Sequence, residues 1–302
     1  MNPSAPPTDT LKTVLDLWRH GISTLNRAEV FFGHGLANAQ DEVRHLLLHT
    51  LALPRDEDPS PWLSARVLPE ERALFLERLH QRVHQRIPVP YLTQEAWLGD
   101  LPFYCDERVL IPRSFIAEIL EDGLAPLLPD WPSLDRVADV CTGGGSLAIL
   151  LALKCPDARV DATDLSADAL AVATINRAHY GLEERLQFFQ GDLLSPLEPH
   201  AYSLIITNPP YVDHAAMQSL PPEYHCEPTL ALESGMDGLD HVRRILHQAA
   251  RYLTPDGWLV VEVGHQAERL ERAFPTLPFI WLDLASGGQH VFALPCEALK
   301  VA

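Results

Sequence analysis

Beyond residue 135 the chain alternates short apolar segments with helix-forming segments, and few folds can accommodate this rhythm. Apolar runs predict strands at 136–140, 158–164, 186–192, 202–208 and 257–264, with helices at 145–154, 166–181 and 239–253. Ser166 is a favoured N-cap for the second of these helices. Residues 278–294 add two strands around a Gly-Gly turn. The pattern predicts an α/β fold with a seven-stranded, mostly parallel sheet and helices on both faces.

The segments before this region predict a different organisation. Apolar residues at helical spacing between residues 10 and 86 indicate a small helical domain, which we expect to recognise a protein substrate. Residues 87–114 contain short β-like runs interrupted by prolines and Gly99, which predicts a β-hairpin linker. Residues 1–9 are rich in proline and predict a disordered tail. The sheet domain then spans 115–302.

Composition excludes several classes of protein. No apolar run is long enough to span a bilayer, and the first residues lack a basic and an apolar signal region, so we expect a cytoplasmic protein. The five cysteines are odd in number and never spaced C-x-x-C, which argues against a disulfide framework or a zinc ribbon. The formal charge of −18 makes nucleic acid a poor partner and a basic protein a good one.

A glycine-rich turn follows the first predicted strand and predicts a cofactor site. Gly143, Gly145 and Ala148 satisfy the pattern G-x-G-x-x-A, and Asp164 follows at the end of the second predicted strand. Glycines there let a ligand approach the backbone, and a carboxylate at this distance meets the hydroxyls of an adenosine ribose. Asp192 is placed to face the adenine, or it caps a turn. Either a nicotinamide dinucleotide or S-adenosylmethionine fits these features, since both contain adenosine.

The sequence Asn-Pro-Pro-Tyr after the fourth predicted strand distinguishes the two cofactors. Its prolines stiffen the chain, so that the side-chain oxygen of Asn208 and the carbonyl of Pro209 form two acceptors at a fixed separation. Such a pair fits the two hydrogens of a planar –NH2 group, and Pro210 leads to Tyr211, whose ring offers a stacking face. Holding an amide nitrogen in line with a methyl sulfonium is useful for methyl transfer and not for hydride transfer.

These motifs resemble those of the class I methyltransferases that modify the side-chain nitrogen of glutamine, the PrmB/PrmC group. The shared motifs look like "RVLIPR" (108–113), "DVCTGGGSLAI" (139–149), "DATDLSADALAVATIN" (161–176) and "ITNPPYV" (206–212), and the resemblance covers nearly the whole chain. It implies a Rossmann-like class I methyltransferase domain, S-adenosylmethionine as methyl donor and the N5 atom of a glutamine as acceptor.

The group has one branch that modifies release factors and another that modifies large-subunit ribosomal protein L three. The segment "FFGHGLANAQDEV" (31–43), together with 100–114 and 279–292, is more similar to the ribosomal-protein branch. That likeness implies a basic ribosomal protein as partner, free or in an assembling subunit, which suits the charge of −18. A release factor stays the nearest alternative substrate.

The resemblance also implies roles for individual residues. Those that would hold the cofactor are Cys141, Thr142, Gly143, Gly144, Gly145, Asp164 and Asp192, with Asn208, Arg113 and Phe103 close by. Those that would hold the glutamine are Asn208, Pro209, Pro210 and Tyr211. One departure is visible, because Gly144 stands where the family usually has serine or threonine. Because only a side-chain hydroxyl is missing, the backbone of the loop can still bind the cofactor.

Other features and functions are weaker candidates. His45 and His49, like His80 and His84, have a zinc-binding spacing but lack a third ligand. The Gly-Gly-Gln of residues 287–289 matches the sequence that release-factor enzymes modify, yet a hairpin turn explains it. An adenine amino-methyltransferase would need a basic groove, against which 23 basic and 41 acidic residues argue. A non-catalytic ribosome-assembly protein is a further alternative.

Overall fold

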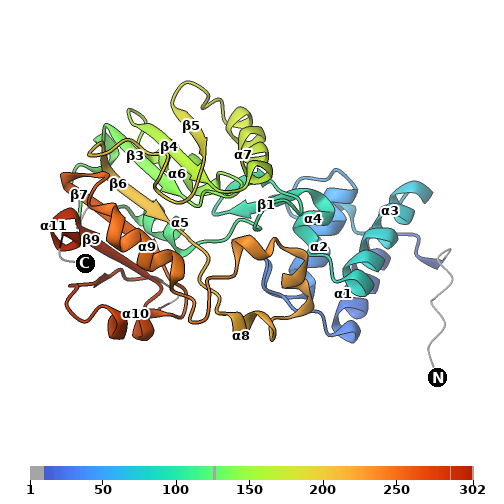
Figure 1. The fold of residues 1–302 in the computed structure, drawn as a ribbon. Coiled ribbons are helices and arrows are strands. Elements are labelled where there is room, and N and C mark those ends of the chain that lie inside the picture. The colour runs from blue at the N-terminus through green and yellow to red at the C-terminus, as the bar shows by residue number, and fades with distance from the viewer. Residues whose placement is uncertain (1–9, 125–126, 286, 301–302) are drawn as a thin grey trace. The chain divides into compact units, whose positions relative to one another are not determined.

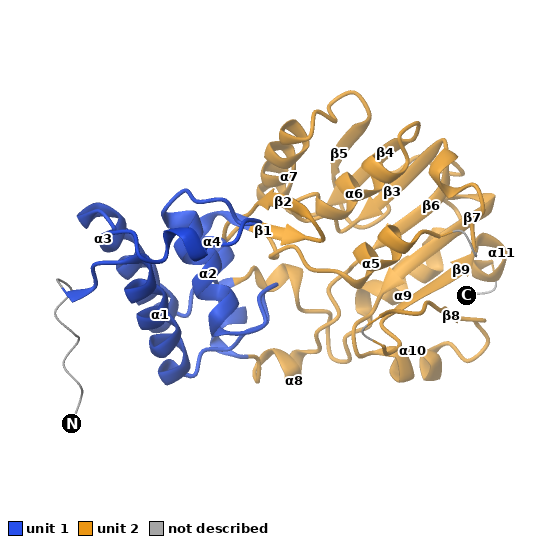
Figure 2. Ribbon diagram, turned by 180° about the vertical axis from the view of Figure 1, so that it is seen from behind, with its two compact units in different colours: residues 1–95, 221–226 blue, residues 96–220, 227–302 orange. Residues whose placement is uncertain are grey.

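The computed structural model describes residues 10–124, 127–285 and 287–300, and these form two compact units (Figure 2). The first comprises residues up to Glu95 together with Pro221–Cys226, and the second comprises the rest of the chain. The first unit therefore extends beyond the expected boundary at residue 86 and includes a short segment from much later in the sequence. The predicted tail, 1–9, lies outside the described residues.

Helices build the first unit. They are α1 (Val14–Ala28), α2 (Ala39–Thr50), α3 (Pro69–His80) and α4 (Val89–Thr93), with a 3-10 turn at Ser60–Trp62 and a π turn at Gln81–Gln85. A capping box starts α1, because the Thr13 hydroxyl accepts the Asp16 N–H while the Asp16 carboxylate accepts the Thr13 N–H. Leu17, Val43 and Phe75 are almost completely buried where the helices meet. The sequence therefore identifies this part correctly as helical.

A buried ion-pair network lies inside the first unit. The Arg82 guanidinium, which is 0% exposed, donates to Glu42 at 2.8 and 3.1 Å and to Glu223 at 3.0 Å. It also donates to the carbonyl of Phe31 at 2.7 Å. Glu223 comes from the 3-10 segment Pro222–Cys226, which thus supplies a charge that the core of this unit needs.

The expected linker is only partly β-structure. A hairpin forms from β1 (Glu95–Leu98) and β2 (Leu101–Tyr104), with Gly99 at a positive φ in the turn. Val89–Thr93, which was expected to belong to the hairpin linker, is instead the helix α4. Its first turn contains Pro90, where the missing N–H of proline costs the helix no hydrogen bond.

One seven-stranded sheet organises the second unit, in the order β5-β4-β3-β6-β7-β9-β8 (Figure 1). The strands are β3 (Arg136–Val140), β4 (Arg159–Asp164), β5 (Leu186–Gln190), β6 (Tyr202–Thr207), β7 (Leu253–Glu262), β8 (Ile280–Trp281) and β9 (Val291–Pro295). Neighbours from β5 to β7 are parallel, and β9 runs antiparallel to β7 and β8. The predicted class I methyltransferase fold is confirmed.

Helices cover both faces of this sheet. They are α5 (Phe115–Asp122), α6 (Ser146–Lys154), α7 (Ala167–His179), α9 (Asp240–Ala249), α10 (Ala267–Ala273) and α11 (Cys296–Leu299). The short helix α8 (His214–Met217) and the 3-10 turns at Trp131–Ser133 and Thr229–Ala231 belong to the connecting segments. Apolar residues of α5 and α6 pack in one core, and those of α9, α10 and α11 pack in a second core against the opposite face. The central strands are buried on both sides, which explains their uninterrupted apolar sequences.

The remaining expectations concern turns and cysteines. Gly287 and Gly288 lie between β8 and β9, both with positive φ, while Ser286 lies outside the described residues. The five cysteines form no disulfide. Among the described residues, no helix has the length and apolar content needed to cross a membrane.

Candidate active site

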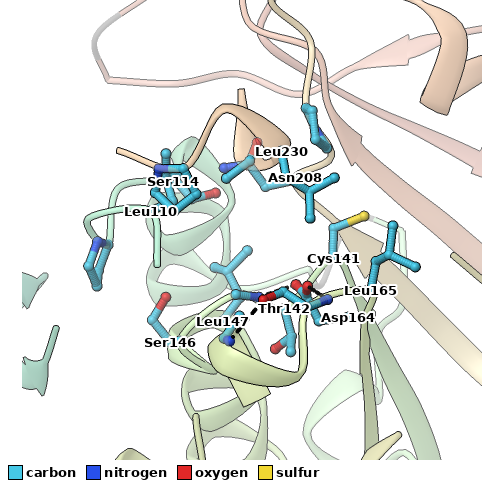
Figure 3. Close-up of a pocket in the computed structure, with 18 of the residues that line it drawn as sticks. Leu110, Ser114, Cys141, Thr142, Ser146, Leu147, Asp164, Leu165, Asn208 and Leu230 are labelled. Carbon is cyan, nitrogen blue, oxygen red and sulfur yellow. Dashed lines mark hydrogen bonds between the residues drawn. The ribbon is translucent and has the colours of Figure 1, made fainter. Parts of the chain in front are cut away.

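A cavity of about 980 Å³, including the part open to solvent, lies beyond the carboxyl ends of β3, β4 and β6 (Figure 3). Ligands of open parallel sheets bind at this edge. In Figure 3, Asn208 and Ser114 lie on one side of the cavity and Asp164 and Thr142 on the other. The structure thus brings the predicted cofactor loop and the Asn-Pro-Pro turn to a single site.

The cofactor loop is an open backbone turn that leads into α6. Cys141, Gly143 and Gly145 all have positive φ, and a Cβ added at Gly143 would meet no atom within 4 Å. A ligand can therefore contact the backbone directly. Gly145 is required for packing, because a Cβ there would lie 3.1 Å from Cβ of Ala173 on α7. At Gly144 a Cβ would make an ordinary contact, so this glycine is not a steric necessity.

Asp164 fixes the loop from the end of β4. One carboxylate oxygen accepts the Gly143 N–H at 2.8 Å and the other accepts the Ser166 N–H at 2.9 Å. Burial raises the pKa of this carboxyl, and the two backbone donors oppose that shift. Each oxygen keeps a lone pair, so the carboxylate can also accept hydroxyls of a ligand.

A second carboxylate is buried beneath the loop. Asp139, the fourth residue of β3, is 0% exposed and accepts the hydroxyl of Thr142 at 2.6 Å. Burial raises the pKa of Asp139 to about 7, although the Thr142 hydroxyl favours the charged form. Asp139 therefore anchors the loop from below and changes charge near neutral pH.

Asp192 and His241 both line the cavity. Asp192 is exposed and pairs with Arg244 of α9, while Nδ1 of His241 lies 2.8 Å from Oγ of Ser234. Burial is the main cause that lowers the pKa of His241. Asp192 therefore lies at the cavity, and its adenine-facing role stays a prediction.

Asn208 leaves the end of β6 with its side chain held in one orientation. Its Nδ2 donates to the main-chain carbonyl of Arg113 at 3.3 Å, which leaves Oδ1 as the acceptor for another group. Pro209 and Pro210 are buried and have no N–H, so they supply no competing donor. Asn208 and Pro210 line the cavity. This geometry presents the Asn208 oxygen as an acceptor, and the Pro209 carbonyl as the second acceptor stays a prediction.

Four of the predicted site residues do not line this cavity, namely Phe103, Gly145, Pro209 and Tyr211. The ring of Tyr211 packs on Gly264, where a Cβ would lie 2.6 Å from it, and its hydroxyl lies 3.5 Å from Glu262. Phe103 is 1% exposed and packs in the core against Tyr180. Phe103 therefore supports the site through packing, because its strand alternation directs it inward rather than toward the ligand.

Two glutamates at the site have no counterpart in the sequence prediction. Glu227 binds both arms of the Arg113 guanidinium at 2.6 Å, and Glu262 accepts the Ser114 hydroxyl and the Phe115 N–H. Glu262 ends the buried strand β7, and a lone acid at such a strand end is a signal that could have identified it. Glu227 follows the 3-10 segment Pro222–Cys226 and has no comparable local signal.

Among the described residues, no cluster of three or more His, Cys, Asp or Glu side chains could hold a metal ion. The paired histidines of the first unit have other contacts. His45 lies 3.3 Å from the Thr93 hydroxyl, and burial lowers its pKa to about 4. Nδ1 of His49 lies 3.3 Å from the Arg78 guanidinium.

Comparison with known proteins decides the family. Residues 113–221 match the model of the methyltransferase small domain. A ribosomal protein uL3 glutamine methyltransferase of Bordetella pertussis is 50% identical over 96% of this chain and 97% of its own length. The chain belongs to the family of uL3 glutamine methyltransferases. Relatives of the same description from Neisseria meningitidis serogroup B and Bradyrhizobium diazoefficiens are 49% and 46% identical, over 96% and 93% of this chain and 95% and 90% of their own lengths.

Membership of this family confirms the predicted branch. The sequence assigned the chain to the glutamine methyltransferases from the cofactor loop and the Asn-Pro-Pro-Tyr turn, and to the ribosomal-protein branch mainly from residues 31–43. The relatives cover nearly the full chain, including the helical unit that contains this segment. The enzyme class, a glutamine methyltransferase, is likewise confirmed.

Proposed function

We propose that this protein methylates the side-chain amide nitrogen N5 of a glutamine in ribosomal protein uL3, with S-adenosylmethionine as methyl donor. The observation that carries the proposal is the orientation of Asn208 at the cavity, with Nδ2 bound to Arg113 and Oδ1 left for a substrate. The family of the chain supplies the substrate. Since ribosomal subunits assemble in the cytoplasm, the protein would act there.

The residues of the cavity fit the proposed methyl donor. The open backbone at Gly143 and the first turn of α6 can receive its polar groups, and the Asp164 carboxylate can accept ribose hydroxyls. When bound, S-adenosylmethionine supplies an electrophilic methyl group on a positively charged sulfur. Leu147 and Leu193 line the same cavity and offer apolar surface for a purine.

Asn208 and Pro209 would act by gripping the substrate amide. Their two oxygens accept both hydrogens of the –NH2 group, which turns the nitrogen toward the methyl carbon and returns electron density to it. Held in this way, the amide nitrogen would form a bond to the methyl carbon as the bond from that carbon to sulfur breaks, with the electron pair of the broken bond remaining on sulfur. The extra proton on nitrogen leaves to water. Positioning of this kind is worth up to ~7–11 kcal/mol, so the site needs no strong base.

The test is a methyl-transfer assay with the full-length protein and radiolabelled S-adenosylmethionine. Purified uL3, a release factor, and DNA or RNA are offered in parallel reactions. We expect label on uL3, at a glutamine identified by mass spectrometry of its peptides. Label on the release factor or the nucleic acid and not on uL3 would overturn the proposal.

A further inference from the structure

Glu227 binds both ends of the tripeptide Ile111-Pro112-Arg113, and this tripeptide contacts Asn208, the residue proposed to hold the substrate amide. One carboxylate oxygen accepts the Ile111 N–H at 3.0 Å and an Nη1–H of Arg113 at 2.6 Å. The second oxygen accepts an Nη2–H of Arg113 at 2.6 Å. Pro112 lies between the two clamped residues, so the tripeptide has little backbone freedom left.

The clamp is buried and strongly bonded. The Glu227 side chain is 0% exposed, whereas Arg113 is 26% exposed and lines the cavity. A bidentate pair of guanidinium and carboxylate has a fixed planar geometry, and burial shields it from competing water. Glu227 itself does not line the cavity. Its effect on a ligand must therefore pass through Arg113 or through a residue that Arg113 contacts.

Asn208 is the residue that connects Arg113 to the proposed substrate amide. The carbonyl of Arg113, within the clamped tripeptide, accepts the Asn208 Nδ2–H at 3.3 Å. This bond decides which end of the Asn208 amide faces the cavity, because a rotated side chain would present a donor instead of an acceptor to the substrate. We infer that Glu227 is a positioning residue that keeps the Asn208 oxygen toward the glutamine by fixing the Arg113 carbonyl. The effect of Glu227 on catalysis rests on the proposed function, whereas its effect on the orientation of Asn208 does not.

A spectroscopic experiment tests the positioning without any substrate. Since the chain has only five asparagines, labelling with ¹⁵N-asparagine gives few side-chain –NH2 signals, and the Asn208 signal is the one lost in Asn208→Ala. In Glu227→Gln we expect this signal to move and its hydrogens to exchange faster with water. The Asn176 signal should stay unchanged, since its Nδ2 donates to Tyr104 and Gly144 instead.

Kinetic measurements on the same variant distinguish a change in the position of Asn208 from a general loss of folded structure. For Glu227→Gln we expect kcat to fall about 10- to 100-fold, while KM for uL3 and the Kd for S-adenosylmethionine change less than about threefold. Arg113→Lys keeps a cation beside the carboxylate and should fold if Glu227→Gln does not. It should show the same changes in the Asn208 signal and in kcat, with smaller size.

Asp161→Asn is the matched control. Asp161, in the middle of β4, is a buried acid that accepts two N–H groups of Arg136 and the Tyr202 hydroxyl, and both partners are the first residues of their strands, away from the carboxyl ends that face the cavity. It should lower the Tm as Glu227→Gln does and leave kcat and the Asn208 signal unchanged. An unchanged Asn208 signal in folded Glu227→Gln and Arg113→Lys, or an equal loss of kcat in Asp161→Asn, would overturn the inference. Failure of the wild-type protein to methylate uL3 would overturn the proposed function alone.

Discussion

The side chain of Asn208 contributes a single acceptor to the cavity, so its removal should affect the chemical step most. Asn208→Ala removes one of the two oxygens that grip the substrate amide, and we expect kcat to fall by roughly 100-fold or more. The Kd for S-adenosylmethionine, measured by calorimetry, should change little. Asp164→Ala is the matched variant, and it should weaken binding of the methyl donor first. Normal turnover by Asn208→Ala would contradict the two-acceptor mechanism.

Asp139 makes stability depend on pH. Its pKa is about 7 when folded against 3.8 in the unfolded chain, so between pH 4 and 7 the folded state binds more protons. The contribution of this group to the free energy of unfolding is therefore complete below about pH 4 and is lost as pH rises through 7. Asp139→Asn avoids burying the charge, and its Tm should rise relative to wild type between pH 5 and pH 8.

Differential scanning calorimetry of both proteins across that range measures this effect. Asp157→Asn, at an exposed position of the same unit, is the control and should show a constant Tm difference from wild type. A Tm difference for Asp139→Asn that stays flat from pH 5 to pH 8 would show that burial of this carboxylate has no energetic consequence.

At the scale of elements, two adjacent glycines in the turn from β3 into α6 differ in the space available for a side chain. Gly145→Ala places a Cβ 3.1 Å from Ala173 at a φ of +83°, and we expect a loss of about 1–3 kcal/mol in stability and weaker binding of the methyl donor. Gly144→Ala makes only an ordinary contact with Val172, at 3.5 Å, and should stay within about 0.5 kcal/mol. Chemical denaturation and calorimetric titration of both variants measure the two effects. Equal losses would refute the steric argument.

The elements also show what a single sequence can predict. Helix α7 begins after Ser166 as its cap predicts, and β3 and β6 end where the glycine turn and the prolines stop them, because such signals act over a few residues. Helix α4 is only five residues long and contains a proline, so its local pattern favours no one structure. The contacts of Glu227 with Arg113 join residues 114 positions apart, and no local pattern encodes them. Local chemistry therefore predicted the loop and Asn208, and missed the residues that support them.

At the scale of the whole molecule, charge should govern the encounter with the substrate. The chain has a formal charge of −18 and its proposed substrate is a basic protein, so electrostatic attraction should speed their association. We expect KM for uL3 to rise several-fold between about 50 and 300 mM NaCl, because salt screens charges on the surface. KM for S-adenosylmethionine and kcat should change much less in the same assays. A KM for uL3 that is independent of salt would show that the acidic surface has no part in recognition.

The division of the chain into units bears on the order in which the protein acquires its structure during synthesis. The first unit includes Pro221–Cys226, and Glu223 supplies a partner to the buried Arg82. When residues 1–95 leave the ribosome, Glu223 has not yet been translated, and Glu42 alone is present of the two carboxylates that pair with Arg82 in the described structure. An N-terminal domain ordinarily folds first as it emerges. Here the helical unit completes its core only after more than two thirds of the polypeptide has been made, so its maturation is tied to that of the catalytic unit.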